Sequence, residues 1–229
     1  MKRTLVISLL ILSTVIATAQ TTTPPPTTTA PPSESKIRLN GYASYVFDDG
    51  FDVYSDANSY FNGTINGGLQ WGAGVEFLLN PFFSLELLYF NKASDAPTTF
   101  RFGSLNEKYE VFDVNFNSIL LGFNRLQTSS NGKVQGYGGL LVGMLITDLE
   151  VPSTGNSDSH TSFSWGGRMG ANIWMSDKIG IKLQAQVLSA TKATGGEFYF
   201  SYYGPVVFST YTTLWQFGLG GGLTFKLGK

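Results

Sequence analysis

Seven stretches of this chain alternate apolar residues with glycine or small polar residues at a period of two. The clearest stretch runs from Ile65 to Leu79, where one set of alternate positions holds leucine, tryptophan, valine and phenylalanine, and the other holds mainly glycine and amides. Successive side chains of a strand point to opposite faces. Each stretch therefore predicts a strand with one apolar face and one small or polar face, and no stretch shows a convincing helical period.

The N-terminus reads as an export signal. Lys2 and Arg3 precede a mostly apolar run, Leu5 to Ile16, and Ala17-Thr18-Ala19 supplies a small-x-small cleavage site. The apolar run is short against the roughly 20 residues that a membrane-spanning helix needs. We predict a signal peptide at residues 1–19. The chain has no cysteine, so disulfides, thiolate metal sites and an acylated-cysteine anchor are excluded.

Residues 20–35 form a predicted spacer. The segment from Thr21 to Ser35 reads TTTPPPTTTAPPSES, in which eleven of fifteen residues are threonine or proline. Such a composition cannot bury a core, and its prolines favour extended polyproline II. We interpret it as a solvated periplasmic spacer. O-glycosylation of the threonines, or docking to a periplasmic protein, remain alternatives.

Residues 36–229 have the length of one domain. Charged residues make up only 14% of the chain, against about 25% in typical soluble domains. Aromatic residues also reach 14%, and there are 27 glycines. The formal net charge of −1 gives no reason to expect a nucleic-acid partner. Few charges with many aromatics and glycines suit an outer surface that meets lipid.

The predicted strands alternate between short and long connections. Three connections are short and four are long, which predicts an antiparallel up-and-down sheet with one plain rim and one elaborated rim. Outer-membrane barrels have short periplasmic turns and long extracellular loops. The fold class predicted is therefore all-β, an eight-stranded transmembrane β-barrel, with strands at 36–47, 64–79, 83–90, 111–125, 134–147, 161–174, 179–189 and 212–227.

Four motifs carry a resemblance to a known group of proteins. They begin at Gly72 (GAGVEFLLNP), Ser84 (SLELLY), Gly180 (GIKLQAQ) and Gly220 (GGGLTFKL). Residues 36–229 resemble the eight-stranded outer-membrane barrels of Gram-negative bacteria, the porin-family-like OmpA/OmpW superfamily. The resemblance implies a location in the Gram-negative outer membrane, with outer-membrane lipid and lipopolysaccharide as partners. The end of the chain departs from it, because Phe225 is followed by Lys-Leu-Gly-Lys rather than ending the chain.

Four charged residues fall on the predicted polar faces. A turn at residues 80–82 places Glu76 opposite Glu86, and two carboxylates at cross-strand distance need a cation nearby. Arg168 and Lys182 lie on strands predicted to face them across the lumen. We predict one neutral, inward-facing cluster of Glu76, Glu86, Arg168 and Lys182. It is either a gate or proton-sensitive plug, as the resemblance implies, or a polar core that fixes register. We expect six further residues to extend it: Asp113, Asn115, Asn117, Gln184, Gln186 and Gln216.

No catalytic or metal site is predicted. His160 is the only histidine, and His160-Thr161-Ser162 matches the His-x-Ser spacing of lipid A deacylases, but no suitable acid accompanies it. The spacing of Asp48, Asp49, Asp52 and Asp56 does not match a calcium loop. No cofactor is expected. These residues are interpreted as an exposed histidine and a solvated acidic loop, with specific Ca²⁺ binding as the alternative for the loop.

The last long loop concentrates aromatic residues, which usually marks an interaction surface. Its predicted contact residues are Phe198, Tyr199, Phe200, Tyr202 and Tyr203; a tall self-packed hairpin is the alternative. We therefore expect a non-enzymatic barrel that acts as a structural or interaction protein through its extracellular loops. A narrow channel for small or hydrophobic solutes is the first alternative, and a lipid A-modifying enzyme is disfavoured.

Overall fold

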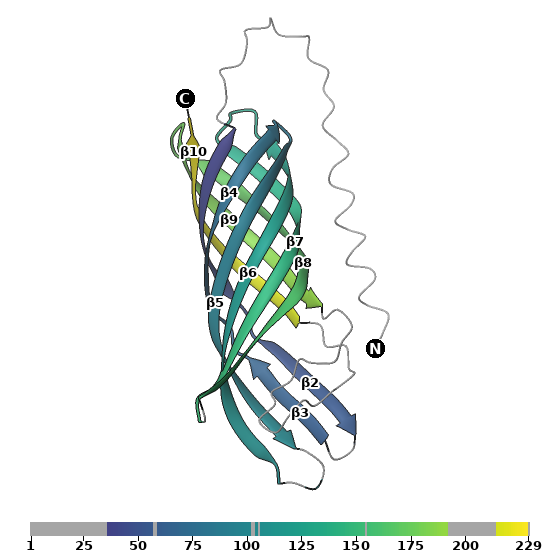
Figure 1. Cartoon of the computed structure of the whole chain (residues 1–229). Coiled ribbons are helices and arrows are strands. Elements are labelled where there is room, and N and C mark those ends of the chain that lie inside the picture. The colour runs from purple at the N-terminus through teal and green to yellow at the C-terminus, as the bar shows by residue number, and fades with distance from the viewer. Residues whose placement is uncertain are drawn as a thin grey trace, which may run out of the picture. The chain divides into compact units, whose positions relative to one another are not determined.

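The computed structural model describes one barrel (Figure 1). It covers residues 36–56, 59–101, 104, 106–153, 155–191 and 214–228, and for 52–56, 59, 61 and 191 it describes the backbone alone. All of these residues belong to one compact unit, Ser35–Lys229. The predicted signal peptide, the spacer and the aromatic loop residues Phe198, Tyr199, Phe200, Tyr202 and Tyr203 lie outside the described residues. No described helix is long and apolar enough to cross a membrane.

Eight antiparallel strands close into a ring. Each strand pairs with its neighbours in space, and the pairings of β1 with β10 and of β5 with β6 complete the circle. The predicted all-β, eight-stranded, up-and-down barrel is therefore confirmed. The ring consists of β1 (Ile37–Val46), β4 (Gly68–Asn80), β5 (Phe83–Arg101), β6 (Lys108–Thr128), β7 (Val134–Val151), β8 (Asn156–Trp174), β9 (Ile179–Thr191) and β10 (Leu214–Leu227).

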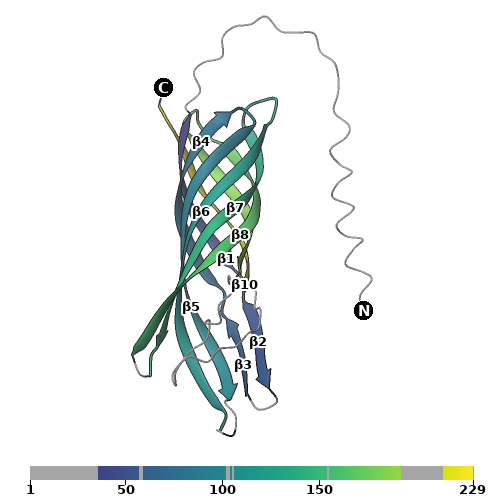
Figure 2. The same cartoon turned by 45° about the vertical axis from the view of Figure 1, so that its right-hand side comes forward.

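The structure adds a hairpin that the sequence analysis placed in a loop. Strands β2 (Asp49–Asp56) and β3 (Ser59–Ile65) pair with each other, and β3 pairs with the far part of β5 from Gly63↔Thr98 to Tyr60↔Arg101. Strands β5 to β8 also run well past their predicted ends. Figure 2 shows these strands continuing beyond the ring on the side opposite the short turns. We call this the long-loop end and the other the short-turn end.

The apolar faces point outwards along the ring, as a membrane barrel requires. On β4, Leu69 and Trp71 are 67% and 53% exposed, whereas Gln70 and Glu76 between and beyond them are buried. The same alternation continues on β1, β9 and β10. A closed band of exposed leucine, isoleucine, phenylalanine and tryptophan is unstable in water. The barrel therefore spans a lipid bilayer.

Strand β6 departs from the predicted orientation. Asp113, Asn115 and Asn117 were expected to face the lumen, but they share the outward face with Ile119 and Leu121. That expectation was wrong because this face is apolar only within the bilayer. Beyond the bilayer the same outward positions become polar, and apolar residues fill the inward positions instead.

Two apolar clusters occupy inward positions. One lies next to the charged residues of the lumen and joins Tyr42, Leu88, Phe90, Leu120, Leu141 and Leu188. The other lies between the extended strands and joins Ala96, Phe100, Phe112, Val114, Phe116 and Leu145. Eight strands enclose an interior just wide enough for side chains to fill. Glycine relieves the crowding at Gly170, where a Cβ atom would meet the Leu183 carbonyl oxygen and the Tyr137 ring.

Candidate functional site

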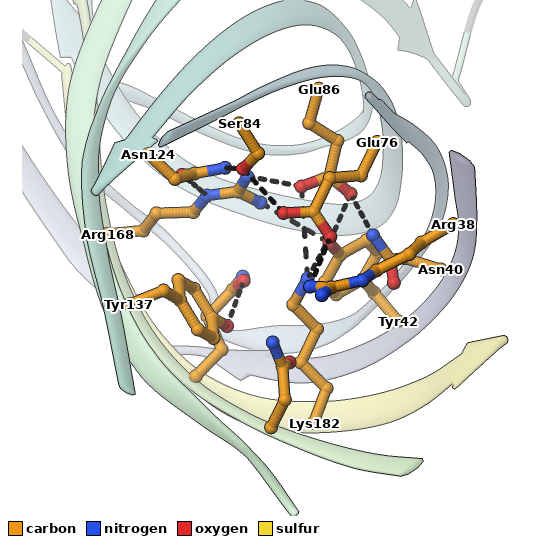
Figure 3. A network of polar contacts seen from close by, with 12 residues as sticks. Arg38, Asn40, Tyr42, Glu76, Ser84, Glu86, Asn124, Tyr137, Arg168 and Lys182 are labelled. Atoms are coloured by element: carbon orange, nitrogen blue, oxygen red, sulfur yellow. Dashed lines mark hydrogen bonds and ion pairs between the residues drawn. The ribbon is translucent and has the colours of Figure 1, made fainter. Parts of the chain in front are cut away.

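The charged residues of the lumen meet in one cluster near the short-turn half of the barrel (Figure 3). Strand register places Glu76 directly opposite Glu86 on β5 and opposite Arg38 on β1. Arg168 of β8 and Lys182 of β9 reach the same point from the other wall. The predicted residues Glu76, Glu86, Arg168 and Lys182 thus lie together and are all buried.

Glu86 is the best-satisfied carboxylate of the cluster. Its Oε2 forms an ion pair with Arg168 Nη2 across the lumen. Its Oε1 accepts hydrogen bonds from Asn40 Nδ2 at 2.6 Å and from the Tyr42 hydroxyl at 2.5 Å. Hydrogen bonds to an ionised group are shorter and stronger than neutral ones. Glu86 therefore ties β1, β5 and β8 together in an interior that water does not reach.

Glu76 is held more loosely. Its Oε2 lies 3.6 Å from Arg38 Nη1 and 4.0 Å from Lys182 Nζ, and this oxygen has no hydrogen bond. Its Oε1 accepts a hydrogen bond from the Ser84 hydroxyl at 2.6 Å. Glu76 Oε2 is therefore held by electrostatic attraction to Arg38 and Lys182 and not by hydrogen bonds.

Lys182 is shared between the two carboxylates. Its Nζ lies 3.9 Å from Glu86 Oε2, similar to its distance from Glu76. The ammonium also lies over the Tyr42 ring at 5.3 Å and the Tyr137 ring at 4.8 Å, where the negative face of each ring attracts a cation. Two aromatic rings and two carboxylates therefore replace the water that this lysine loses on burial.

Arg38 is the member that sequence reasoning missed. The prediction paired two acids with two bases, but Arg38 brings the count to three cations and two carboxylates, a formal charge of +1. The sequence does contain a signal for an inward-facing Arg38, because Arg38 shares a strand face with the polar Asn40 and Ser44. The error was to consider cations only on the strands opposite Glu76 and Glu86 and not on the neighbouring β1.

A second polar layer follows the first along the lumen. Gln186 Nε2 donates to Gln70 Oε1 at 2.5 Å, and Gln184 Nε2 donates to Gln186 Oε1 at 2.8 Å. Gln184, Gln186 and Gln216 are buried and inward-facing, as expected. The Tyr137 hydroxyl donates to Gln184 Oε1 at 3.1 Å, and the Tyr137 ring contacts Lys182. The glutamine layer therefore extends the charged cluster along the lumen.

The remaining predicted positions do not join this cluster. His160 is half-buried on β8, two positions from the buried Ser162, while Asp158 is exposed and accepts the Ser159 N–H at 2.9 Å. Asp48 accepts the Gly67 N–H at 2.6 Å and Asp49 accepts the Trp215 N–H at 2.9 Å. Within the described residues, no group of three or more histidine and acidic side chains has a metal-binding arrangement.

Burial raises the pKa of Asp49 above its usual value, and its hydrogen bond from the Trp215 N–H and the nearby Lys92 oppose that rise. Asp49 begins β2, outside the membrane-spanning ring. Asp48 and Asp49 together join the segment that follows β1 to Gly67, which precedes β4, and to Trp215 of β10. Both aspartates therefore have structural hydrogen bonds to backbone N–H groups.

No protein-family model and no curated protein matches this chain. Solved structures do resemble it. Neisserial surface protein A, from Neisseria, is 11% identical with a TM-score of 0.57, and the match covers 86% of this chain and 100% of that one. The outer membrane protein OprG from Pseudomonas aeruginosa is 14% identical with a TM-score of 0.54, covering 85% and 98%. The shared fold is that of Gram-negative outer-membrane barrels, which agrees with the predicted location.

Proposed function

We propose that this chain is a non-enzymatic outer-membrane protein, structural or interactive, which presents its long-loop end to the outside of the cell. In this proposal residues 1–19 are a signal peptide, residues 20–35 are a periplasmic spacer and residues 36–229 form the barrel. The observation that carries the proposal is the closed lumen. In this proposal a barrel whose lumen is filled by side chains acts through the surfaces that it presents at its two ends.

The closure is visible along β5. Its inward positions begin with Ser84 and Glu86 and continue through Leu88, Phe90 and Lys92, and each of these side chains is at most 1% exposed. The neighbouring strands contribute equally buried residues, among them Leu120 and Leu141. Charged and apolar layers therefore succeed one another without a water-lined path past these residues.

The surface proposed for contact with other molecules is the outer face of the extended strands. Just beyond the apolar band, Tyr89 donates to Asn117 Oδ1 at 2.7 Å and Asn91 donates to Asn115 Oδ1 at 2.8 Å. Ser159 donates to Asp148 Oδ1 at 2.6 Å one strand further on. These bonds hold amides and carboxylates in place at the depth of the lipid headgroups. Such a surface supports contact with the sugars and bridging cations of lipopolysaccharide.

The channel alternative requires movement of the packed layers. Opening the lumen would separate Glu86 from Arg168 and unpack Leu88, Leu120 and Leu141. A buried charge left unpaired costs about 3–5 kcal/mol, which opposes spontaneous opening. An enzymatic role has less support, since the charged cluster, including the Ser84 hydroxyl that donates to Glu76, is buried where a substrate does not reach it.

Two measurements test the proposal. The full-length protein in planar bilayers should show no steady conductance; a stable ohmic current would establish the channel alternative. Titration with purified lipopolysaccharide should show binding that is lost when residues 149–158 are replaced by Asn-Gly, which joins β7 and β8 at the Asp148↔Ser159 pair. The matched control replaces the short turn 129–133 in the same way. Equal lipopolysaccharide binding by both variants and the wild type would refute the role of the long-loop end.

A further inference from the structure

Ionisable residues outside the packed lumen are sorted by sign along the barrel. Among the described residues, the short-turn end carries five cations and one carboxylate, Lys36, Arg125, Lys133, Lys178 and Lys226 against Asp177. Among the side chains that the structure describes, the long-loop end carries nine carboxylates and two cations outside the lumen, Asp48, Asp49, Asp95, Glu107, Glu110, Asp113, Asp148, Glu150 and Asp158 against Arg101 and Lys108. The chain's formal charge of −1 conceals this separation.

Backbone hydrogen bonds bring three of these cationic residues close together in the fold, and one of them contacts a tryptophan ring. The backbone N–H of Trp174 donates to the backbone carbonyl oxygen of Lys133, and the backbone N–H of Lys226 donates to that of Lys178, both at 2.8 Å. Lys226 Nζ lies 4.0 Å from the centre of the Trp174 ring. These bonds join the turn after β6, the turn after β8 and the end of β10. We call Lys133, Lys178 and Lys226 the basic rim.

Arg38 strengthens the positive field of the basic rim from inside the lumen. Its guanidinium lies 5.0 Å from the Trp174 ring centre, on the way from the rim to Glu76. Arg38 and Lys226 are cross-strand partners on β1 and β10. The rim is thus continuous with a lumen cluster whose own formal charge is +1, so the charges behind it do not neutralise it.

An apolar strip borders the basic rim on the outside of the barrel. Its members are exposed side chains at the short-turn ends of β8, β9 and β10, and they are Ile173, Met175, Ile179, Phe225 and Leu227. Phe225 pairs with Ile179 across β10 and β9, which makes the strip continuous. A ligand that uses both surfaces needs a negative head and an apolar tail.

We infer that the basic rim binds the phosphate headgroup of an anionic phospholipid in the leaflet at the short-turn end, with the acyl chains on the apolar strip. Lys133 and Lys178 are exposed at the level where the apolar band ends, which is where lipid phosphates lie. Basic residues at an anionic membrane surface each contribute binding energy that falls with salt. The inference rests on the membrane-spanning fold and not on the role proposed for the long-loop end.

The test compares two pairs of charge-removing substitutions in the full-length protein. Lys133→Gln with Lys178→Gln removes two exposed rim cations from turns. Arg101→Gln with Lys108→Gln removes two cations from the opposite end and is the matched control. Heat-modifiable gel mobility establishes that both variants form the barrel. Native mass spectrometry then measures the binding of phosphatidylglycerol and phosphatidylcholine to each protein in detergent.

The wild type should prefer phosphatidylglycerol, and raising the salt concentration should weaken that preference. The rim variant should bind phosphatidylglycerol about 25-fold more weakly, about fivefold for each lost cation, while the control stays within about twofold of wild type. Equal losses in both variants, or no loss in the rim variant, would overturn the inference. Displacement of phosphatidylglycerol by millimolar inorganic phosphate would also overturn it, because the rim would then be a site for free anions.

Discussion

Replacing Glu86 with glutamine should destabilise the barrel more than replacing Arg168 with methionine, although glutamine is the closer match in shape. The wild-type cluster holds three cations and two carboxylates, a formal +1. Glu86→Gln raises this to +2, whereas Arg168→Met lowers it to zero. The two partners of one ion pair are therefore unequal. Lys182 remains beside Glu86 when Arg168 is lost, whereas the second acid, Glu76, pairs with Arg38 and Lys182 and not with Arg168.

The contacts give the magnitudes. After Glu86→Gln, Arg168 keeps Asn124 Oδ1 at 3.1 Å and the Tyr42 hydroxyl at 3.4 Å, both neutral. A buried charge without its partner costs about 3–5 kcal/mol, and we expect about 4 kcal/mol here. After Arg168→Met, Glu86 keeps two hydrogen bonds and has Lys182 Nζ at 3.9 Å. Glu86 is then not left without a cation, so we expect a loss of about 2 kcal/mol, below the roughly 3–5 kcal/mol of an unpaired buried charge.

Equilibrium unfolding in urea, with the protein folded into phosphatidylcholine vesicles and followed by tryptophan fluorescence, measures both losses. Glu150→Gln, at an exposed position on β7, is the control and should change the free energy of unfolding by less than about 0.5 kcal/mol. A larger loss for Arg168→Met than for Glu86→Gln would show that Lys182 does not compensate, and the charge count would then be the wrong description of this cluster.

Three further predictions use the same unfolding measurement. Gly170→Ala should cost about 1–3 kcal/mol, because the new Cβ meets the Leu183 carbonyl and the Tyr137 ring, whereas Gly41→Ala, with no atom within 4 Å, should not destabilise; equal effects would contradict the packing argument. Asp48→Ala should cost about 1 kcal/mol through loss of the 2.6 Å bond from the Gly67 N–H, and Asp48→Asn should restore most of it; failure of asparagine to do so would point to charge rather than hydrogen bonding. Deleting residues 20–35 should leave the unfolding midpoint unchanged, since the segment offers no apolar surface; a lower midpoint would mean that it packs on the barrel.

Local pattern was enough to predict the ring and part of the cluster. A strand's period of two is a property of the backbone, so apolar alternation predicts both the strands and the face that meets lipid. A short turn at residues 80–82 sets the register of the two strands that it joins, and Glu76 and Glu86 do lie opposite each other. The strands and this register could therefore be predicted from residues that are close together in the sequence.

The incorrect predictions concern residues that are far apart in the sequence, or strand segments that pass from lipid into water. Asp113, Asn115 and Asn117 lie on the outward face of β6, because the polarity of that face reverses where the strand leaves the bilayer. The hairpin of β2 and β3 carries no apolar period, since outside the membrane hydrogen bonds to a neighbouring strand suffice to hold it.

Periodicity in the sequence predicted the eight strands of the ring and their lipid-facing sides, and the pattern of residues 1–19 predicted export of the chain. Only the tertiary structure decided which charges meet. Arg38 and Arg168 enter the same cluster from strands 130 positions apart in numbering. Ring closure sets the diameter of the lumen, and the diameter decides which inward side chains touch, how many charges share one buried volume and whether water passes between them.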